Sequence, residues 1–375
     1  MPNASRLYLK MQVSAGYAND LESGGAASPL DNFFTLRTVT WDNGTVRMID
    51  QTALPNKFRY VRYTRSDQVA AAITTMVVRG APAIGVAAGM GLALAAVHSK
   101  ARALPDLLRE MESAAALLRG TRPTAVNLFW GVDRMMKKAN SATSVQEAKE
   151  ALVAEARAME DEDVEVNRRL GRSGADLIHD GDTVLTQCNA GALATVGYGT
   201  ALGVVRAAVE QGKLVKVLVP ETRPALQGAR LTAFELVRDK IACTLISDTA
   251  VGHMMSLGRV DCVIVGADRI TRDGFVFNKI GTYQEAVLAK RHQVPFYPAA
   301  PRSTFDLARS HQQVTIEERG ASEVVQIRGR RIAPRGVPVA NPAFDMTPPE
   351  LVTSMITERG LVNAPFEENI PRLMS

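Results

Sequence analysis

The stretch TVLTQCNAGALATVGYGTALG, residues 183–203, decides the fold of the C-terminal half of the chain. A short apolar run ends at Cys188, a polar and glycine-rich turn follows, and a helix-like pattern begins near residue 194. A strand that passes through a turn into a helix is the repeating unit of a parallel α/β sheet. Cys188 is therefore either a small buried hydrophobic residue or one wall of an active site at the mouth of a strand.

Four more apolar runs repeat this pattern further along the chain. They are LVKVLVP, ACTLIS, VDCVIVGA and VPFYPAA, and helical stretches beginning near residues 225, 249 and 281 lie between them. Short apolar runs that alternate with helices are typical of parallel strands buried on both faces. The pattern predicts a Rossmann-like domain with a mainly parallel sheet.

The N-terminal half has a different organisation. FFTLRTVTW, TVRMID and FRYVRY have the alternation of short strands, and Asn43-Gly44 between the first two is a hairpin signal. Residues 67–157 then form one helical pattern after another. This half is predicted to be a small β-sheet plus a helical bundle, which makes the whole chain an α/β protein.

We expect three parts along the chain. Residues 1–33 are rich in small and polar residues, so they are predicted to be a disordered extension, with the folded chain starting near Leu36. Residues 34–160 are predicted to be the β plus helical domain, and residues 161–375 the Rossmann-like catalytic domain. A length of 375 residues is ample for two domains, each with its own core.

The composition of the chain restricts the kinds of molecule that it is expected to bind. The net charge of +5 is mild, and the basic residues are scattered apart from Arg328–Arg331. We therefore expect no nucleic acid, whereas a small anionic substrate fits. No run was expected to be long and apolar enough to span a membrane. The three cysteines show no CxxC spacing, which favours a reducing compartment.

The sequence predicts neither a metal site nor a cofactor. The five histidines show no ligand-like pairing and no HExxH motif. A dinucleotide fingerprint would need a third glycine in the segment 197–202, GYGTAL, where leucine stands instead. That segment is also predicted to lie inside the helix and not in the turn before it.

Polar residues follow every predicted strand. Because the carboxyl ends of parallel strands meet at one edge of a sheet, all of them are expected to face one crevice. In chain order they are Cys188-Asn189, Glu221-Thr222-Arg223, Ser247-Asp248, Asp268-Arg269 and Pro301-Arg302-Ser303.

Three other stretches have the character of anion sites. VVRGAPAIG places Arg79-Gly80 before Pro82 at a predicted helix start, where backbone N–H groups and the helix dipole favour a negative charge. TRPTAVN repeats the pattern with Arg122, and FNKIGTY places Asn278-Lys279 before a third helix. Taken alone, each is equally compatible with an ordinary solvated turn.

Together these residues resemble the methylthioribose-1-phosphate isomerase family, from about residue 34 to the C-terminus. The same fold resembles the regulatory subunits of the translation-initiation guanine-nucleotide exchange factor. The motifs that carry the resemblance are DQTALP (50–55), RGAPAIG (79–85), TRPTAVNL (121–128), QCNAGALATVGYGTALG (187–203), ETRPALQGARLTAFEL (221–236), GADRI (266–270), NKIGTY (278–283) and PFYPAAPRSTFD (295–306).

The resemblance implies an aldose–ketose isomerase of methionine salvage that is a homodimer without a cofactor, in the cytoplasm and also the nucleus. It implies that Cys188 is catalytic and that Asp268 is the proton donor. The substrate contacts that it implies are Arg79, Gly80, Ala81, Arg122, Gln227, Asn278 and Lys279.

The implied substrate sets a chemical problem. It is a furanose whose anomeric phosphate blocks spontaneous opening, so a general acid must protonate the departing ring oxygen. Asp268 follows an apolar run, a setting that raises a carboxyl pKa. Hydrogen then moves from C2 to C1 as a hydride or through deprotonation, with Cys188 assisting as thiol or thiolate. The sequence leaves both routes open.

Two alternatives remain on the sequence alone. A ribose-1,5-bisphosphate isomerase would need a second phosphate pocket in place of an apolar one. A non-catalytic exchange-factor subunit would have no need of Cys188 and Asp268 together with Arg79, Arg122 and Lys279, all of which are present.

Overall fold

The computed structural model describes residues 32–374 except Thr124 and Arg328, so the predicted extension over 1–31 lies outside the described residues. The folded chain starts earlier than the expected Leu36. Phe33, which we assigned to the extension, is fully buried, packs edge-on against Phe234 and donates its N–H to the Asp239 carboxylate at 2.7 Å. The sequence pattern missed this contact because its partners lie about two hundred residues away.

The N-terminal sheet confirms the three predicted strands. β1 (Val39–Asp42), β2 (Thr45–Ile49) and β3 (Tyr60–Tyr63) form an antiparallel meander in that order. Asn43 and Gly44 connect β1 to β2 with φ angles of 47° and 77°, as a two-residue hairpin turn requires.

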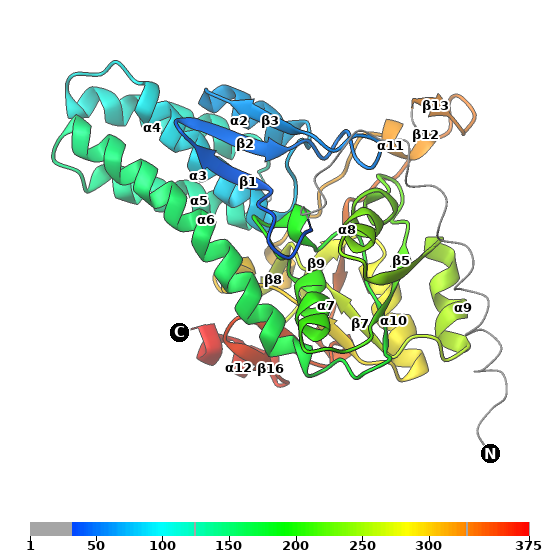
Figure 1. The fold of residues 1–375 in the computed structure, drawn as a ribbon. Helices are drawn as coiled ribbons and strands as arrows, with labels where there is room; N and C mark the ends of the chain where they lie inside the picture. The colour runs from blue at the N-terminus through cyan, green and yellow to red at the C-terminus, as the bar shows by residue number, and fades with distance from the viewer. Residues whose placement is uncertain (1–31, 124, 328, 375) are drawn as a thin grey trace. The chain divides into compact units, whose positions relative to one another are not determined.

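The helical part surrounds one central helix (Figure 1). α2 (Ser66–Thr74), α4 (Leu104–Arg119), α5 (Val126–Asn140) and the first half of α6 (Val145–Ala175) pack around α3 (Ala81–His98). The crossing of α3 and α5 is close, because a Cβ at Gly131 would lie 2.3 Å from the Gly85 carbonyl oxygen.

α3 corrects one expectation. By length and composition, Ala81–His98 is apolar enough to cross a membrane, although we expected no such run. In the fold, 78% of that helix is buried by its neighbours. A helix that is apolar on every side is what the centre of a helical bundle requires.

The C-terminal part contains the predicted parallel sheet. Its strands β4 (Thr183–Leu185), β5 (Lys216–Pro220), β6 (Ala242–Ile246), β7 (Cys262–Val265) and β10 (Phe296–Pro298) have the order β10-β7-β4-β5-β6. The chain therefore starts in the middle, builds one half of the sheet and then returns to build the other. This reversal beside β4 is the doubly wound switch point, where α/β sheets form their ligand crevice.

Helices cover both faces of this sheet. The second half of α6, α7 (Ala201–Glu210) and α8 (Ala233–Arg238) pack on one face, and α9 (Val251–Ser256) and α10 (Thr282–His292) on the other. α6 places Met159 in the helical core and Leu170 in the core of the sheet. The predicted boundary at residue 160 thus falls within one continuous helix.

The helix predicted near residue 194 starts later, at Ala201. Only a short 3₁₀ turn, Ala192–Ala194, forms where we expected it to begin. Gly199 has a φ of 86°, and a Cβ there would lie 2.5 Å from the Gly191 carbonyl carbon. The segment 197–199 is therefore a loop before the helix, contrary to our prediction, because its glycine allows a backbone that a helix cannot have.

A second, mixed sheet was not predicted. β8 (Arg269–Thr271), β9 (Val276–Lys279), β11 (Phe305–Asp306) and β14 (Phe344–Thr347) form it in the order β11-β8-β9-β14. Its strands are short and carry charged residues, so they lack the apolar alternation that identifies strands in a sequence. The remaining elements are α11 (Ser322–Val325), the hairpin β12 (Gln326–Ile327) and β13 (Arg330–Arg331), the hairpin β15 (Met355–Thr357) and β16 (Gly360–Val362), and α12 (Phe366–Met374).

Candidate active site

A cavity lies outside the carboxyl ends of β4 and β7, between the start of α3 and the strands β9 and β14. Side chains from both halves of the chain line it. Every site residue implied by the family resemblance is among them, while their roles stay predictions: Arg79, Gly80, Ala81, Arg122, Cys188, Gln227, Asp268, Asn278 and Lys279.

Cys188 has an unusual backbone. Its φ of 59° is left-handed, a conformation that a residue with a Cβ adopts only when its surroundings hold it there. Two fully buried threonines do so. The Cys188 N–H donates to Thr222 Oγ1 at 3.0 Å, and the Cys188 carbonyl accepts from Thr232 Oγ1 at 2.6 Å. The thiol is half-buried and faces the cavity.

Asp268 follows β7, and its N–H donates to the Phe277 carbonyl at 2.9 Å. Its half-buried side chain faces the cavity. Removal from bulk water raises the pKa of this carboxyl above its ordinary value, because burial disfavours the charged form. Four cations act in the opposite direction without cancelling the effect: Lys279, Arg122, Arg79 and Arg319.

Lys279 and Asn278 reach the site from β9, which pairs with β14. Lys279 Nζ lies 4.7 Å from the centre of the Phe344 ring and donates to the Ala343 carbonyl at 2.9 Å. Burial lowers the pKa of Lys279, and the nearby Cys188 opposes this. Asn278 donates to Thr282 Oγ1 at 3.0 Å, which connects the strand to the start of α10.

The start of α3 forms another wall. Gly80 precedes the first turn with a φ of 94°, and a Cβ there would lie 2.3 Å from the Ala194 carbonyl oxygen. Only glycine therefore permits this approach, which leaves the first backbone N–H groups of the helix beside the cavity. The Arg79 guanidinium donates to Asn189 Oδ1 at 2.9 Å and to the Asn189 carbonyl at 2.8 Å.

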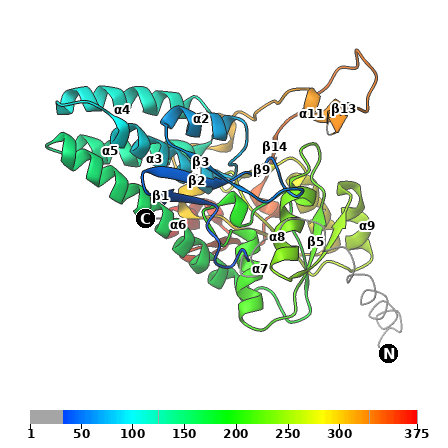
Figure 2. The same ribbon diagram turned by 45° about the horizontal axis from the view of Figure 1, so that its top comes forward.

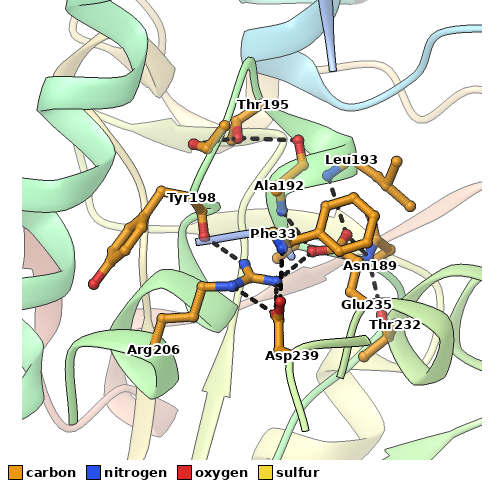
Figure 3. Close-up of polar contacts among 12 residues, drawn as sticks. Phe33, Asn189, Ala192, Leu193, Thr195, Tyr198, Arg206, Thr232, Glu235 and Asp239 are labelled. Carbon is orange, nitrogen blue, oxygen red and sulfur yellow. Dashed lines mark hydrogen bonds and ion pairs between the residues drawn. The ribbon is translucent and has the colours of Figure 1, made fainter. Parts of the chain in front are cut away.

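Asn189 is itself oriented by a buried carboxylate. Its side-chain nitrogen donates to Glu235 Oε1 at 2.9 Å and to Thr232 Oγ1 at 3.2 Å (Figure 3). Glu235 also accepts the backbone N–H groups of Ala192 and Leu193 at 2.8 and 3.0 Å. Glu235 thus fixes the position of the loop that carries Cys188 and Asn189.

Arg206 completes this buried network. It is fully buried and pairs with Glu235 at 2.8 Å and Asp239 at 2.6 Å, and it donates to the Tyr198 carbonyl at 2.5 Å (Figure 3). The sequence analysis missed all three charged residues, because a charge inside a helical pattern gives no sign of whether it is buried.

Gln227 presents an acceptor to the cavity. The residue is 5% exposed, and its Oε1 has no hydrogen-bond partner among the described residues. Gly228 opens a π-helical turn, Gly228–Thr232, that packs so closely on β5 that a Cβ would lie 1.8 Å from the Pro220 oxygen. Such turns are frequent at functional sites. A buried acceptor of this kind is suited to a ligand hydroxyl.

Several predicted residues lie outside the cavity, so the expectation that every strand end faces one crevice is wrong. Asp248 accepts the N–H groups of Thr222 and Arg223, both at 2.7 Å, and Arg269 pairs with Asp306 at 3.3 Å. These groups hold loops and neighbouring strands instead. The others outside the lining are Glu221, Thr222, Arg223, Ser247, Arg302 and Ser303.

Other lining residues were missed by the sequence analysis. Met76, Arg319 and Phe344 also face the cavity, and the last two come from a region without helical or strand periodicity. The part of the chain that the structure describes holds no group of three or more His, Cys, Asp or Glu side chains arranged for a metal ion. The expectation of a site without metal or cofactor stays a prediction.

Comparison with known proteins places this site in a family. The model of the initiation factor 2 subunit family matches residues 77–364. The methylthioribose-1-phosphate isomerase of Thermosipho africanus is 53% identical over 337 residues, which are 90% of this chain and 97% of that protein. This chain belongs to the initiation factor 2 subunit family, in its methylthioribose-1-phosphate isomerase branch. The Acetivibrio thermocellus isomerase is similar at 49% identity, covering 90% of this chain and 99% of its own.

Solved structures of the family agree with the fold. The 5-methylthioribose 1-phosphate isomerase of Pyrococcus horikoshii has a TM-score of 0.85 and 48% identity, covering 90% of this chain and 95% of its own. A structure described as eIF-2B subunit delta from A. fulgidus has a TM-score of 0.82 and 51% identity, covering 91% and 99%. An eIF2B beta chain from Chaetomium thermophilum, 16% identical with a TM-score of 0.52 and covering 80% and 86%, shares the fold alone.

The buried network generates a stability prediction. Glu235→Ala leaves Arg206 without one of its two buried carboxylates, so we expect the free energy of unfolding to fall by about 3–5 kcal/mol. The matched control is Glu165→Ala, which removes an exposed pair with Arg172 and should cost less than about 1 kcal/mol. Urea unfolding measures both. Equal losses in the two variants would contradict the importance of the buried pair.

Proposed function

We propose that this chain converts 5-methylthioribose 1-phosphate into 5-methylthioribulose 1-phosphate, a step of methionine salvage. One observation carries the proposal: the cavity brings a thiol, a carboxyl with a raised pKa and several cations together. The names of the isomerases that share about half of its residues over nine-tenths of its length support the same substrate. The steps below assign roles to the chain's own residues.

Ring opening comes first. The anomeric phosphate prevents the sugar from opening by itself, so the bond between C1 and the ring oxygen must break while the phosphate stays on C1. The departing oxygen needs a proton, and Asp268 is the proposed donor because burial raises its pKa, which favours the protonated form. The surrounding cations are well placed to stabilise the carboxylate that remains.

Hydrogen transfer follows. In the hydride route, hydrogen moves with its electron pair from C2 to the electron-poor C1, and the C2 hydroxyl gives its proton to the Asp268 carboxylate as it becomes the ketone. In the proton route, a base takes the C2 hydrogen as a proton to give an enol, C1 then receives a proton from that base, and the C2 hydroxyl gives its own proton to the Asp268 carboxylate as it becomes the ketone. Cys188, held beside Lys279 in the same cavity, is the group that assists at this centre. Both routes restore the protonated Asp268.

The phosphate is bound by the cationic side of the cavity. Arg79 makes its hydrogen bonds to the neutral oxygens of Asn189, and Lys279 makes its bond to a carbonyl, so both keep their charge for a ligand. The N-terminus of α3 adds backbone N–H groups and the positive end of its dipole.

The two alternative functions account for fewer features of the cavity. A non-catalytic subunit has no need of a half-buried carboxyl surrounded by cations, and the A. fulgidus structure described as a translation initiation factor subunit is as similar to this chain as the named isomerases are. A bisphosphate isomerase needs a second anion pocket. Met76, Pro82 and Ala194 instead give part of the lining an apolar character, which suits a methylthio group.

Mutation of the two reacting residues tests the proposal. We expect Cys188→Ser and Asp268→Asn each to lower kcat by at least about a hundredfold, because each removes the group that assists or transfers a proton. The assay follows ketone formation from 5-methylthioribose 1-phosphate. Cys243→Ser and Asp106→Asn, outside the cavity, are the matched controls and should keep wild-type rates. Near-normal turnover in the two cavity variants would refute the assignment.

The raised pKa of Asp268 predicts a pH dependence. The acid works only while it is protonated, so kcat should fall as pH rises through the pKa of Asp268, which lies above that of an ordinary aspartate. In the Asp268→Asn variant this descending limb should vanish from the residual activity. A wild-type rate that climbs steadily with pH instead would mean that Asp268 acts as a base from the start.

Assembly and location are further proposals. We propose a homodimer with closed two-fold symmetry, as most soluble oligomers have, and a reducing compartment such as the cytoplasm for its free thiols. Light scattering at low micromolar concentration should give twice the 40.5 kDa mass of the chain. A mass equal to one chain would refute the dimer.

A further inference from the structure

The excursion, which is the chain segment between Arg319 and Asn341, has both of its ends beside the cavity. The Ala343 N–H donates to the Glu317 carbonyl at 2.8 Å, and the Arg319 N–H donates to the Asn341 carbonyl at 3.0 Å. Between them, α11 and the β12–β13 hairpin extend away from the site (orange in Figures 1 and 2). The two ends therefore form one wall that carries Arg319 and Phe344 into the cavity.

Arg319 is fixed in this wall. Its side chain is 10% exposed, and its Nε donates to Glu317 Oε1 at 2.9 Å. Its guanidinium carbon lies 5.9 Å from the centre of the Phe344 ring, the same ring that lies 4.7 Å from Lys279 Nζ. One aromatic ring thus holds the two cations near each other, at a cation–π distance from each.

Glu317 is shared by two arginines. Its second oxygen lies 3.4 Å from Arg122 Nη2, so one carboxylate fixes a cation on each side. The terminal nitrogens of Arg319 make no hydrogen bond to any residue that the structure describes, and the ion pair of Nη1 with Glu323 is long at 4.0 Å. Arg319 lines the cavity, and a guanidinium whose terminal nitrogens make only a long ion pair suits a phosphate.

The charge balance around the cavity also favours the binding of a phosphate. The cations around the cavity are Arg79, Arg122, Lys279 and Arg319, and the carboxylates Glu317 and Glu323 pair with two of them. The four cations outnumber these two carboxylates by two, which is close to the charge of a phosphate monoester near neutral pH. Without Arg319, half of this excess is lost.

We propose that Arg319 is a further substrate-binding residue, that its terminal nitrogens bind the phosphate of the substrate beside Lys279, and that Glu317 and Phe344 position it. The identity of the sugar phosphate rests on the proposed function, whereas the binding of phosphate by Arg319 does not.

Arg319→Met tests the proposal in the full-length protein, because methionine keeps contact with Phe344 and removes the charge. We expect KM for 5-methylthioribose 1-phosphate, and the inhibition constant of inorganic phosphate as a competitor, each to rise at least about tenfold, with kcat within about threefold of wild type. Arg331→Met, an exposed arginine of the same excursion, is the matched control and should leave all three constants unchanged.

The outcomes of this experiment distinguish a substrate-binding role of Arg319 from a structural role. A folded Arg319→Met variant with unchanged KM and unchanged phosphate inhibition would overturn the proposal and leave Arg319 a structural residue. If that variant does not fold, Arg319→Gln, which still donates to Glu317, gives the same comparison. If the wild-type protein does not isomerise the sugar phosphate, the proposed function fails, and calorimetric binding of inorganic phosphate to wild type and Arg319→Met still decides the role of Arg319.

Discussion

The pairing of Arg206 with Glu235 and Asp239 is the interaction on which the site depends. A guanidinium without any contact to water must be matched by buried carboxylates, and both lie within 2.8 Å. Once fixed, Glu235 has oxygens left for the N–H groups of Ala192 and Leu193 and for the Asn189 amide. An ion pair outside the cavity lining thereby sets the position of the loop that carries Cys188.

From that loop the same constraint extends across the cavity. Asn189 orients Arg79, which comes from the helical half of the chain, and Glu317 orients Arg122 from that same half. The N-terminal and C-terminal parts of the site are therefore held together by polar contacts that converge on the cavity. α6 also connects the two parts, because it contributes residues to both hydrophobic cores.

The electrostatics of the cavity combine two opposed effects. Burial favours a neutral carboxyl at Asp268 and lowers the pKa of Lys279, whereas the surrounding charges favour the ionised forms. A phosphate dianion would offset the positive excess and so weaken the cations' pull on Asp268, which would favour its protonated form. In the proposed mechanism, binding of the substrate would therefore favour the protonated form of the acid.

Local sequence patterns specified much of the secondary structure of this protein. Asn43-Gly44 specified a hairpin, the apolar runs specified parallel strands, and the nine residues to which the family resemblance gives site roles all line one cavity. The hairpin and the strands follow from patterns over a few residues, since periodicity and turn chemistry act between near neighbours in the chain. The site residues came from the match to the family motifs. The start of α7 was placed too early because the turn at Gly199 packs closely against Gly191, a contact that the local pattern does not show.

Only the tertiary structure decided which polar residues serve the site and which serve the fold. Asp248 and Asp268 both follow strands, yet the first satisfies backbone N–H groups and the second faces the cavity. From its sequence context Arg206 is an ordinary charge on a helix, yet it is fully buried in the structure. Arg319 lies in a loop-like sequence, yet it lines the cavity together with Lys279. Burial and charge pairing depend on residues distant in sequence, which is why no local pattern reveals them.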